Sequence, residues 1–315
     1  MNVGVVGYSE SVEALAQLGK HTECVLKFWQ PEDLPKVKLP RNVKKSSLED
    51  IAQCSLIFFC APAHQARQIA RQLGEKVRAN HVIVHTSREL EPESHRLLSD
   101  VLREETATHR IGFLTGPFRT ADLKAKKSAS GTLFSKFPEV HGIVQDALVS
   151  PVFRVYRSTD LVGGQIAASY SRVISFVYGV GLGMEQGPGV SATLFARGLA
   201  EIGRFVLAAH GQERTVFGMS GAGNLFVDVQ EPFSTEVLLG QKSVEFGHYD
   251  LEKLNAEFGD EIPARFAMLV RAMTDTCSEQ GLVSTIGEAA LAIVEDRMST
   301  KEAATYLMTL PVLDE

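Results

Sequence analysis

The first half of the chain alternates short apolar runs with segments of helical periodicity, and this alternation limits the fold more than any other feature. The apolar runs predict buried strands, and the segments between them predict amphipathic helices. Strands that alternate with helices form βαβ units, so we expect an α/β fold with a Rossmann-like, doubly wound parallel sheet. The strands are predicted at Val3–Val6, Cys24–Trp29, Ser55–Cys60, His81–His85, Gly112–Leu114 and Val152–Tyr156, and the helices at Ser11–Leu18, His64–Gly74 and Glu91–Arg103.

The second half of the chain lacks strand signals and reads as helical. This change of texture predicts two domains: residues 1–158 form a Rossmann-like, dinucleotide-binding-type domain, and residues 159–315 form an all-α, substrate-type domain. The helices expected in the second domain lie at Gln165–Gly179, Ser191–His210, Ile262–Gly281, Thr285–Val294 and Thr300–Met308.

Composition places the chain among globular proteins and excludes several functional classes. Of its 315 residues, 44% are hydrophobic and 22% charged, which is typical of a soluble domain. The net charge of −6 and the lack of a basic stripe argue against a nucleic-acid partner. No apolar stretch reaches the roughly 18 residues of a membrane span. With four cysteines outside any CxxC pair and no signal-like start, we expect reduced thiols and a cytoplasmic protein.

The first predicted strand runs into the turn VGVVGYSESVEALA (3–16), where a dinucleotide-binding protein carries three glycines. The first glycine is present as Gly7, but Ser9 holds the second position and Val12 the third. A β-carbon at Ser9 obstructs a pyrophosphate, and Glu10 adds negative charge where the helix N-terminus otherwise favours an anion. Ser9 or Ser11 can still cap the helix. The turn therefore predicts the fold more strongly than it predicts a cofactor.

The remaining histidine, serine and lysine motifs do not predict a catalytic or metal-binding site. His81 and His85 share one face of a strand, but no third ligand follows at metal-binding spacing, so we expect no metal. The loop GMSGAGNLF (218–226) lacks the GxSxG spacing that would make Ser220 a nucleophile. The segment LKAKKSASG (123–131) is interpreted as a solvated basic surface loop.

Three stretches of the second half carry a resemblance to a known family. SPVFRVYRSTDLVGG (150–164), GVGLGMEQGPGVSATLFARGLAEIGRF (179–205) and VFGMSGAGNL (216–225) together resemble the bacterial type of NAD(P)-dependent glycerol-3-phosphate dehydrogenase. The first half supports the resemblance through IFFCAPAHQ (57–65), HTSRE (85–89) and LTGPF (114–118). The resemblance implies hydride transfer between a nicotinamide and the pair dihydroxyacetone phosphate and glycerol 3-phosphate.

The chain departs from this family at the positions that the resemblance marks as catalytic. The family uses a lysine paired with an aspartate for proton transfer, a second lysine after the fourth strand, and an Arg-Asn pair that grips the substrate phosphate. Matching the motifs places Ser171 at the first lysine, Asn224 at the aspartate, Ser87 at the second lysine, and Thr235 and Glu236 at the Arg-Asn pair. Ser234 is retained, and Arg172 stands where an asparagine follows the catalytic lysine.

These substitutions are chemically coherent. Because both members of the proton-transfer pair are neutral here, the old pocket keeps no unpaired buried charge. Glu236 replaces an attractive cation by a carboxylate, and two unit charges about 4 Å apart interact by about 4 kcal/mol at an effective dielectric near 20. We therefore expect rejection of a phosphate dianion at this position.

The resemblance also marks the positions that would hold NAD or NADP and the substrate. The cofactor positions are Gly7, Ser9, Glu10, Val12, Gln30 and Pro62, and the substrate region holds Gly116, Arg172, Ser234, Thr235 and Glu236. The degenerate cofactor turn predicts that binding of either nicotinamide is weakened.

Two hypotheses remain open. The first is a family member that has lost the family reaction and acts as a binding or regulatory protein. The alternative is an active NAD(P)-dependent oxidoreductase with a changed substrate, in which Arg172, Lys242 or the lysines Lys124, Lys126 and Lys127 rebuild the catalytic set. The expected partner is a small molecule in the interdomain cleft or another protein, and homodimerisation is possible.

Overall fold

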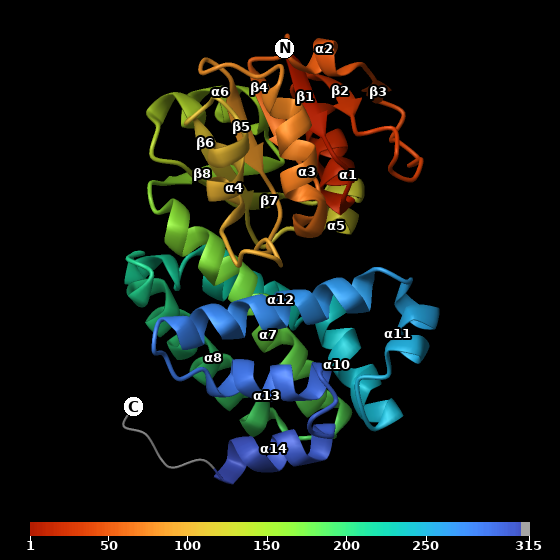
Figure 1. Cartoon of the computed structure of the whole chain (residues 1–315), viewed down its shortest axis with the longest axis vertical. Coiled ribbons are helices and arrows are strands. Elements are labelled where there is room, and N and C mark those ends of the chain that lie inside the picture. Colours follow the sequence, from red (N-terminus) through yellow and green to blue (C-terminus); the bar gives the residue numbers. More distant parts are fainter. Residues whose placement is uncertain (310–315) are drawn as a thin grey trace. The chain divides into compact units, whose positions relative to one another are not determined.

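The computed structural model describes residues 1–309, which divide into two compact units. Unit 1 comprises Met1–Gln165, and unit 2 begins at Ile166. The division lies within the long helix α7 (Leu161–Gly183), whereas the sequence analysis placed the boundary after Ser158. Figure 1 shows both units, with colours that follow the sequence from red at the N-terminus to blue toward the C-terminus.

Unit 1 is built on one eight-stranded sheet with the order β3-β2-β1-β4-β5-β6-β7-β8. The first six positions follow the strand order of a Rossmann fold. The predicted doubly wound α/β fold is confirmed, except that β7 pairs antiparallel with β6, so the sheet is mostly rather than wholly parallel. The strands are β1 Asn2–Val6, β2 Val25–Trp29, β3 Val43–Lys45, β4 Leu56–Phe59, β5 Val82–His85, β6 Ile111–Thr115, β7 Ala129–Phe134 and β8 Phe153–Ser158.

Helices cover both faces of this sheet, because alternate residues of each strand point to opposite sides. Val3 and Val5 pack into one core cluster with Leu15 of α1 and Val144 of α6, while Val6 joins Ile69 of α3 in the other cluster. The helices of unit 1 are α1 Glu10–Gly19, α2 Leu48–Ile51, α3 Ala63–Gly74, α4 Leu98–Glu105, α5 Thr120–Lys124 and α6 Pro138–Leu148.

Two sequence-based assignments in unit 1 are wrong. The segment 123–131 is not one loop, because α5 ends at Lys124 and strand β7 begins at Ala129. The helix predicted over Glu91–Arg103 begins only at Leu98. Before it, the buried Glu91 carboxylate accepts hydrogen bonds from Arg67, and Leu90 bridges to Leu97, which holds the chain out of a helix.

The described part of unit 2 is helical and contains no strand, as predicted. Its long helices α7, α8, α12 and α13 agree with the predicted segments to within a few residues, and α14 confirms the last one. The elements after α7 are α8 Pro188–Ala208, the 3₁₀ helix Glu213–Thr215, the π-helix Met219–Gly223, α9 Asn224–Asp228, α10 Thr235–Phe246, α11 Leu251–Phe258, α12 Ile262–Glu279, α13 Thr285–Val294 and α14 Thr300–Thr309.

Helices α7 and α10 touch backbone to backbone at two glycines. A β-carbon on Gly179 would lie 2.1 Å from the carbonyl oxygen of Val237, and one on Gly240 would lie 2.2 Å from that of Phe176. Only glycine permits this approach. The crossing fixes the first turn of α10 against the middle of α7.

The ARGLAE stretch of α8 contributes two packing contacts. A β-carbon on Gly198 would lie 2.6 Å from Ile174, so glycine lets α8 approach α7. The buried Glu201 carboxylate accepts hydrogen bonds from the backbone amides of Ile286 and Gly287 and from the Thr285 hydroxyl at the N-terminus of α13, and it also bonds Tyr170. Burial and the Glu201 charge raise the pKa of Tyr170 well above its usual value.

None of the helices in residues 1–309 combines the length and the apolar character that crossing a bilayer requires.

Candidate functional site

The cofactor-type residues of unit 1 gather where parallel strands end. In an open α/β sheet, ligands bind outside the carboxyl ends of the strands, at the point where the strand order reverses. Here that point lies between the neighbouring strands β1 and β4. Gly7 follows β1 and Pro62 follows β4, so the structure brings these two predicted positions to the same edge.

Gly7 is required by the turn itself. Its φ angle is +74°, and a β-carbon there would lie 2.6 Å from that of Ala61. Its amide donates to the Trp29 carbonyl oxygen at 3.0 Å, which ties the turn to β2. The first glycine of the fingerprint therefore keeps its conformational role.

The other two fingerprint positions have different roles. Ser9 is the N-cap residue of α1, but its side chain makes no capping hydrogen bond, contrary to one option of the sequence analysis. Val12 is fully buried in the core. The first turn of α1 carries Glu10 and Glu13, and the Glu13 carboxylate pairs with Lys124. A phosphate arriving at this helix end therefore meets negative charge.

Two further cofactor positions are engaged locally. The Gln30 amide group donates to the Pro35 carbonyl oxygen at 2.8 Å. Pro62 is the N-cap residue of α3, and the backbone amide of the next residue, Ala63, donates to the Glu89 carboxylate at 3.1 Å. Glu89 is buried, so an internal carboxylate lies at this helix N-terminus. HTSRE (85–89) includes Glu89, but sequence reasoning assigned it no role.

His85 is the last residue of β5, and Ser87 lies just beyond the strand. Ser87 is half-buried, and His85 is fully buried with its ring stacked on Phe113 at 4.7 Å between centroids. Burial lowers the pKa of His85 to about 3, so the imidazole is neutral at physiological pH. His81 bonds the Ala52 carbonyl oxygen. Residues 1–309 hold no cluster of three or more His, Cys, Asp or Glu that suits a metal ion.

Gly116, which the resemblance places in the substrate region, follows β6. A β-carbon there would lie 2.6 Å from the Cα of Gly131 in β7. The glycine is thus explained by the close approach of these two antiparallel segments.

In unit 2, the two positions of the proton-transfer pair are buried and neutral. Ser171 on α7 is 0% exposed and its hydroxyl donates to the Ala168 carbonyl oxygen at 3.0 Å. Asn224, the first residue of α9, is 1% exposed and its amide group donates to the Ser220 carbonyl oxygen at 3.0 Å. Ser220 is itself fully buried in the π-helix, unlike an exposed nucleophile.

Arg172 and Glu236 form an ion pair that sequence reasoning did not foresee. The Arg172 Nε and the Glu236 Oε1 are 2.7 Å apart, and the side chains are only 18% and 9% exposed. The close crossing of α7 and α10 positions both residues. The Glu236 carboxylate is therefore neutralised by a cation, so the repulsion expected for a bare carboxylate is reduced.

Of the remaining substrate-region positions, Ser234 caps a helix and Thr235 is exposed. Ser234 is the N-cap residue of α10, and its hydroxyl accepts from the Val237 amide at 3.4 Å. Thr235 is exposed in the first turn. The retained serine is thus explained by helix capping.

Of the four lysines considered as replacements, three are held in ion pairs and Lys126 is exposed. Lys242 pairs with Glu245 and Glu257, Lys124 with Glu13, and Lys127 with Asp122. These partners hold their ammonium groups in surface ion pairs.

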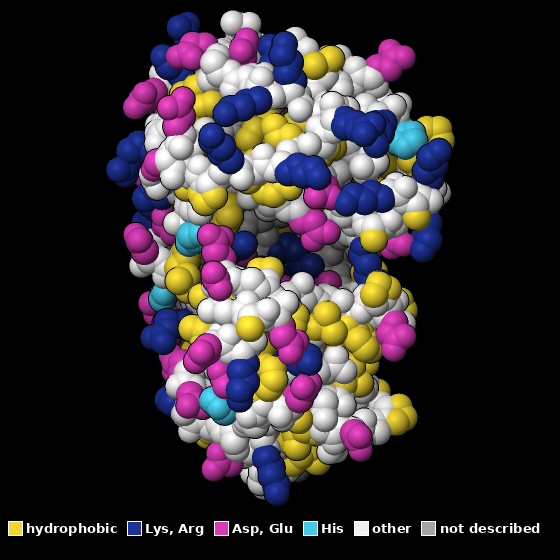
Figure 2. Space-filling view, turned by 90° about the vertical axis from the view of Figure 1, so that its right-hand side faces the viewer, with side chains coloured by type: hydrophobic (Ala, Val, Ile, Leu, Met, Phe, Trp, Pro, Cys, Tyr) yellow, Lys and Arg dark blue, Asp and Glu magenta, His cyan; other side chains and the backbone are white. Residues whose placement is uncertain are grey.

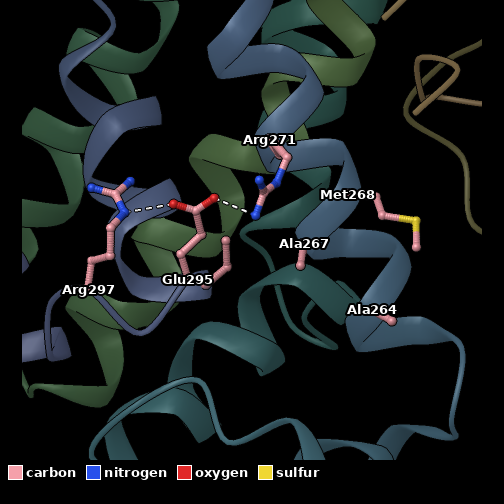
Figure 3. Close-up of a pocket in the computed structure, with 7 residues that line it drawn as sticks. Ala264, Ala267, Met268, Arg271, Glu295 and Arg297 are labelled. Carbon is pink, nitrogen blue, oxygen red and sulfur yellow. Dashed lines mark hydrogen bonds and ion pairs between the residues drawn. The ribbon is translucent and has the colours of Figure 1, made fainter. Parts of the chain in front are cut away.

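One surface pocket of unit 2 contains none of the predicted residues. It has a volume of about 460 Å³ and lies between α12 and the end of α13. Glu295 separates two arginines, with one carboxylate oxygen 2.6 Å from Arg271 and the other 2.7 Å from Arg297 (Figure 3). Its wall is formed by Ala264, Ala267, Met268 and Val294. Since the charges are largely paired and the site is open, it offers no catalytic set.

Comparisons with known proteins agree with the motifs of both units. A glycerol-3-phosphate dehydrogenase [NAD(P)+] of Sinorhizobium fredii is 30% identical over 286 residues, which cover 90% of this chain and 83% of the relative. The chain belongs to the NAD-dependent glycerol-3-phosphate dehydrogenase family. The family's C-terminal model matches residues 160–305, and its N-terminal model matches residues 20–139.

Further relatives extend this result. The glycerol-3-phosphate dehydrogenase [NAD(P)+] of Rhizobium johnstonii is 30% identical over 283 residues, covering 90% of this chain and 84% of the relative. The crystal structure of glycerol-3-phosphate dehydrogenase from Coxiella burnetii has the same fold, with a TM-score of 0.88 at 18% identity over 98% of this chain and 99% of that one. The family's N-terminal match begins at residue 20, so the Gly7 turn lies outside it.

Proposed function

We propose that this member of the glycerol-3-phosphate dehydrogenase family does not catalyse the family reaction and acts as a binding or regulatory protein. The proposal rests on the burial, neutrality and hydrogen bonding of Ser171 and Asn224. Both are buried and neutral, and both donate to backbone carbonyl oxygens of preceding residues. Neither a serine hydroxyl nor an amide titrates near neutral pH, so neither serves as the general acid or base that the reaction needs.

The phosphate region supports the same proposal. By the resemblance, Thr235 and Glu236 replace a phosphate-gripping pair, and the neighbouring Arg172 is already bound to Glu236 at 2.7 Å. A phosphate would have to compete with an internal carboxylate for this guanidinium, which weakens its binding.

The residues present do not fit a nicotinamide dinucleotide well. At the α1 N-terminus, Ser9 adds a β-carbon and Glu10 a negative charge. At the α3 N-terminus, the Glu89 carboxylate already accepts from the Ala63 amide. Helix N-termini attract phosphate through such amides and through their positive dipole end, and both attractions are diminished here. We therefore derive no step that involves the cofactor.

The first experiment is a thermal-shift titration with NADH and NADPH, with and without dihydroxyacetone phosphate. A ligand at a hundred times its dissociation constant stabilises a protein by about 2.7 kcal/mol, which raises the midpoint by about 4 °C for a chain of this length. We expect no shift at millimolar cofactor and no turnover. Interconversion of dihydroxyacetone phosphate and glycerol 3-phosphate that is abolished by Asn224→Ala would contradict the proposal.

One observation favours the alternative of an active oxidoreductase with a changed substrate. The Gly7 turn retains the left-handed conformation and the close approach to Ala61 that a dinucleotide-binding turn uses. A clear shift with NADH or NADPH would support this alternative, and candidate substrates lacking a phosphate would then be screened. Ser9→Gly should increase any such shift, because it removes the obstructing β-carbon.

A further inference from the structure

An exposed cationic segment of unit 1 follows Pro35, the hydrogen-bond partner of Gln30. Between residues 36 and 45 the chain carries five basic and no acidic residues, although its net charge is −6. All five side chains are exposed, and none forms an ion pair with a described residue. We call this set the edge patch; its members are Lys36, Lys38, Arg41, Lys44 and Lys45.

The edge patch is held in place by the fold. Val37 and Leu39 pack against the hydrophobic core, whereas Lys36 and Lys38, which alternate with them, are exposed. The Asn42 amide group donates to the Ala16 carbonyl oxygen of α1 at 2.6 Å. Lys44 and Lys45 belong to β3, the edge strand of the sheet. Figure 2 shows this side of unit 1, where Lys and Arg side chains gather around hydrophobic ones.

Unpaired cations at fixed positions favour a partner of opposite charge. We infer that the edge patch docks an extended acidic segment of a partner protein. Glu or Asp at every second residue of an extended peptide repeats at about 6.6 Å, twice the rise per residue of a strand. Lys36 and Lys38 alternate with the partly buried Val37 and Leu39 in the same period of two. Later in the same segment, Lys44 and Lys45 lie on edge strand β3, and extended peptides commonly bind along sheet edges.

Two other anionic partners fit the patch less well. Single-stranded nucleic acid binds where aromatic side chains stack on its bases, and the patch contains no aromatic residue. Membrane surfaces are bound by apolar side chains that insert between the lipids, whereas Val37 and Leu39 already pack against the core.

The test is fluorescence anisotropy of a labelled poly-glutamate peptide titrated with the full chain at low ionic strength. The test variant is Lys36→Glu/Lys38→Glu, and the matched control is Lys136→Glu/Lys301→Glu, which changes the same charge at exposed lysines elsewhere. We expect the test variant to weaken binding by about tenfold or more while the control stays near the parent value. Binding should also weaken as ionic strength rises from about 20 mM to about 150 mM.

Three results would overturn the inference: no binding of the peptide at low ionic strength, an equal loss in both double variants, or tighter binding of a single-stranded oligonucleotide or of phosphatidylserine vesicles through Lys36 and Lys38. The milder variant Lys36→Gln/Lys38→Gln serves if charge reversal lowers the melting temperature. The outcome is independent of catalysis, since none of these lysines lies at a catalytic or cofactor position.

Discussion

Arg172 on α7 and Glu236 on α10 meet as an ion pair, with Nε and Oε1 2.7 Å apart, one turn from the point where the backbones of these helices touch. The pair occupies the region where the family resemblance places a substrate phosphate. The pair should therefore affect both the stability of unit 2 and the proposed weak binding of an anion in this region.

Removing one partner of this pair should be more harmful than removing both. Glu236→Ala or Arg172→Ala leaves a mostly buried charge unpaired, and we expect each to lower the free energy of unfolding by about 2–4 kcal/mol. The double variant Arg172→Ala/Glu236→Ala should lose less than the sum of its two single changes. Urea unfolding of the four proteins forms the double-mutant cycle. Additive losses would show that the two side chains are not coupled.

The glycine crossing of α7 and α10 makes a second prediction. Gly240→Ala places a β-carbon 2.2 Å from the Phe176 carbonyl oxygen, so the helices must separate, and we expect a loss of about 3 kcal/mol. Gly203→Ala in α8 is the control, because its β-carbon would meet only Val216 at 4.0 Å. This control should be neutral or stabilising by up to about 1 kcal/mol, from helix propensity. Thermal unfolding that ranks the two variants in the opposite order would refute the close crossing.

Glu201 should be indispensable to unit 2 for structural reasons. At the start of α13, its carboxylate accepts hydrogen bonds from two backbone amides and two hydroxyls. It also accepts one from the Tyr170 phenol of α7. Glu201→Ala leaves these buried donors unsatisfied, so we expect a loss of about 3 kcal/mol or more in the free energy of unfolding. Glu201→Gln keeps an acceptor and should lose less. The prediction fails if both variants unfold at the urea concentration of the parent.

His85 should make unit 1 sensitive to mild acid. Its pKa is about 3 in the folded chain and about 6.5 when unfolded, so only the unfolded state takes up a proton between these values. The stabilisation is complete above pH 6.5 and declines by about 1.4 kcal/mol per pH unit as the pH falls toward 3. His141, whose pKa burial also lowers, acts in the same direction.

The measurement is urea unfolding between about pH 7 and pH 5, a range in which carboxylates of ordinary pKa remain ionised. His85→Leu should flatten the pH dependence relative to the parent chain. Replacing the exposed His109 by leucine is the control for loss of an imidazole and should leave the slope unchanged. An unchanged slope in His85→Leu would argue against proton uptake linked to this ring.

Sequence reasoning located the strands whose residues are buried on both faces, because continuous apolar runs such as Leu56–Phe59 leave little ambiguity. It missed β3 and β7 for physical reasons. Val43 is the only buried residue of β3, and β7 begins within a lysine-rich stretch and shows an apolar pattern only near Phe134. The late start of α4 depends on the contact between Arg67 and Glu91, which are far apart in the sequence.

The candidate site shows the same limit. Motif spacing assigned Ser171, Asn224 and Glu236 to the family's site, and this assignment stays a prediction. It could not show that Arg172 lies against Glu236, or that Glu89 reaches the N-terminus of α3, because both contacts depend on how separate elements pack. Ser234 was matched as a substrate-region residue. Its role as the N-cap of α10 could not be predicted, because the start of that helix was not predicted.

The strand pairing also bears on how the chain folds. The pairs Leu26↔Val43 and Asn2↔Val25 at one end of the sheet, and Phe113↔Phe134 and Ala129↔Phe153 at the other, join residues separated by short stretches of chain, whereas the pair Val3↔Leu56 closes a loop about twice as long. Contacts between residues near in sequence form sooner, because less chain entropy is lost on closing the loop. We therefore expect β1 to β3 and β6 to β8 to assemble early as two separate ends of the sheet, and the pairing of β1 with β4 to form last.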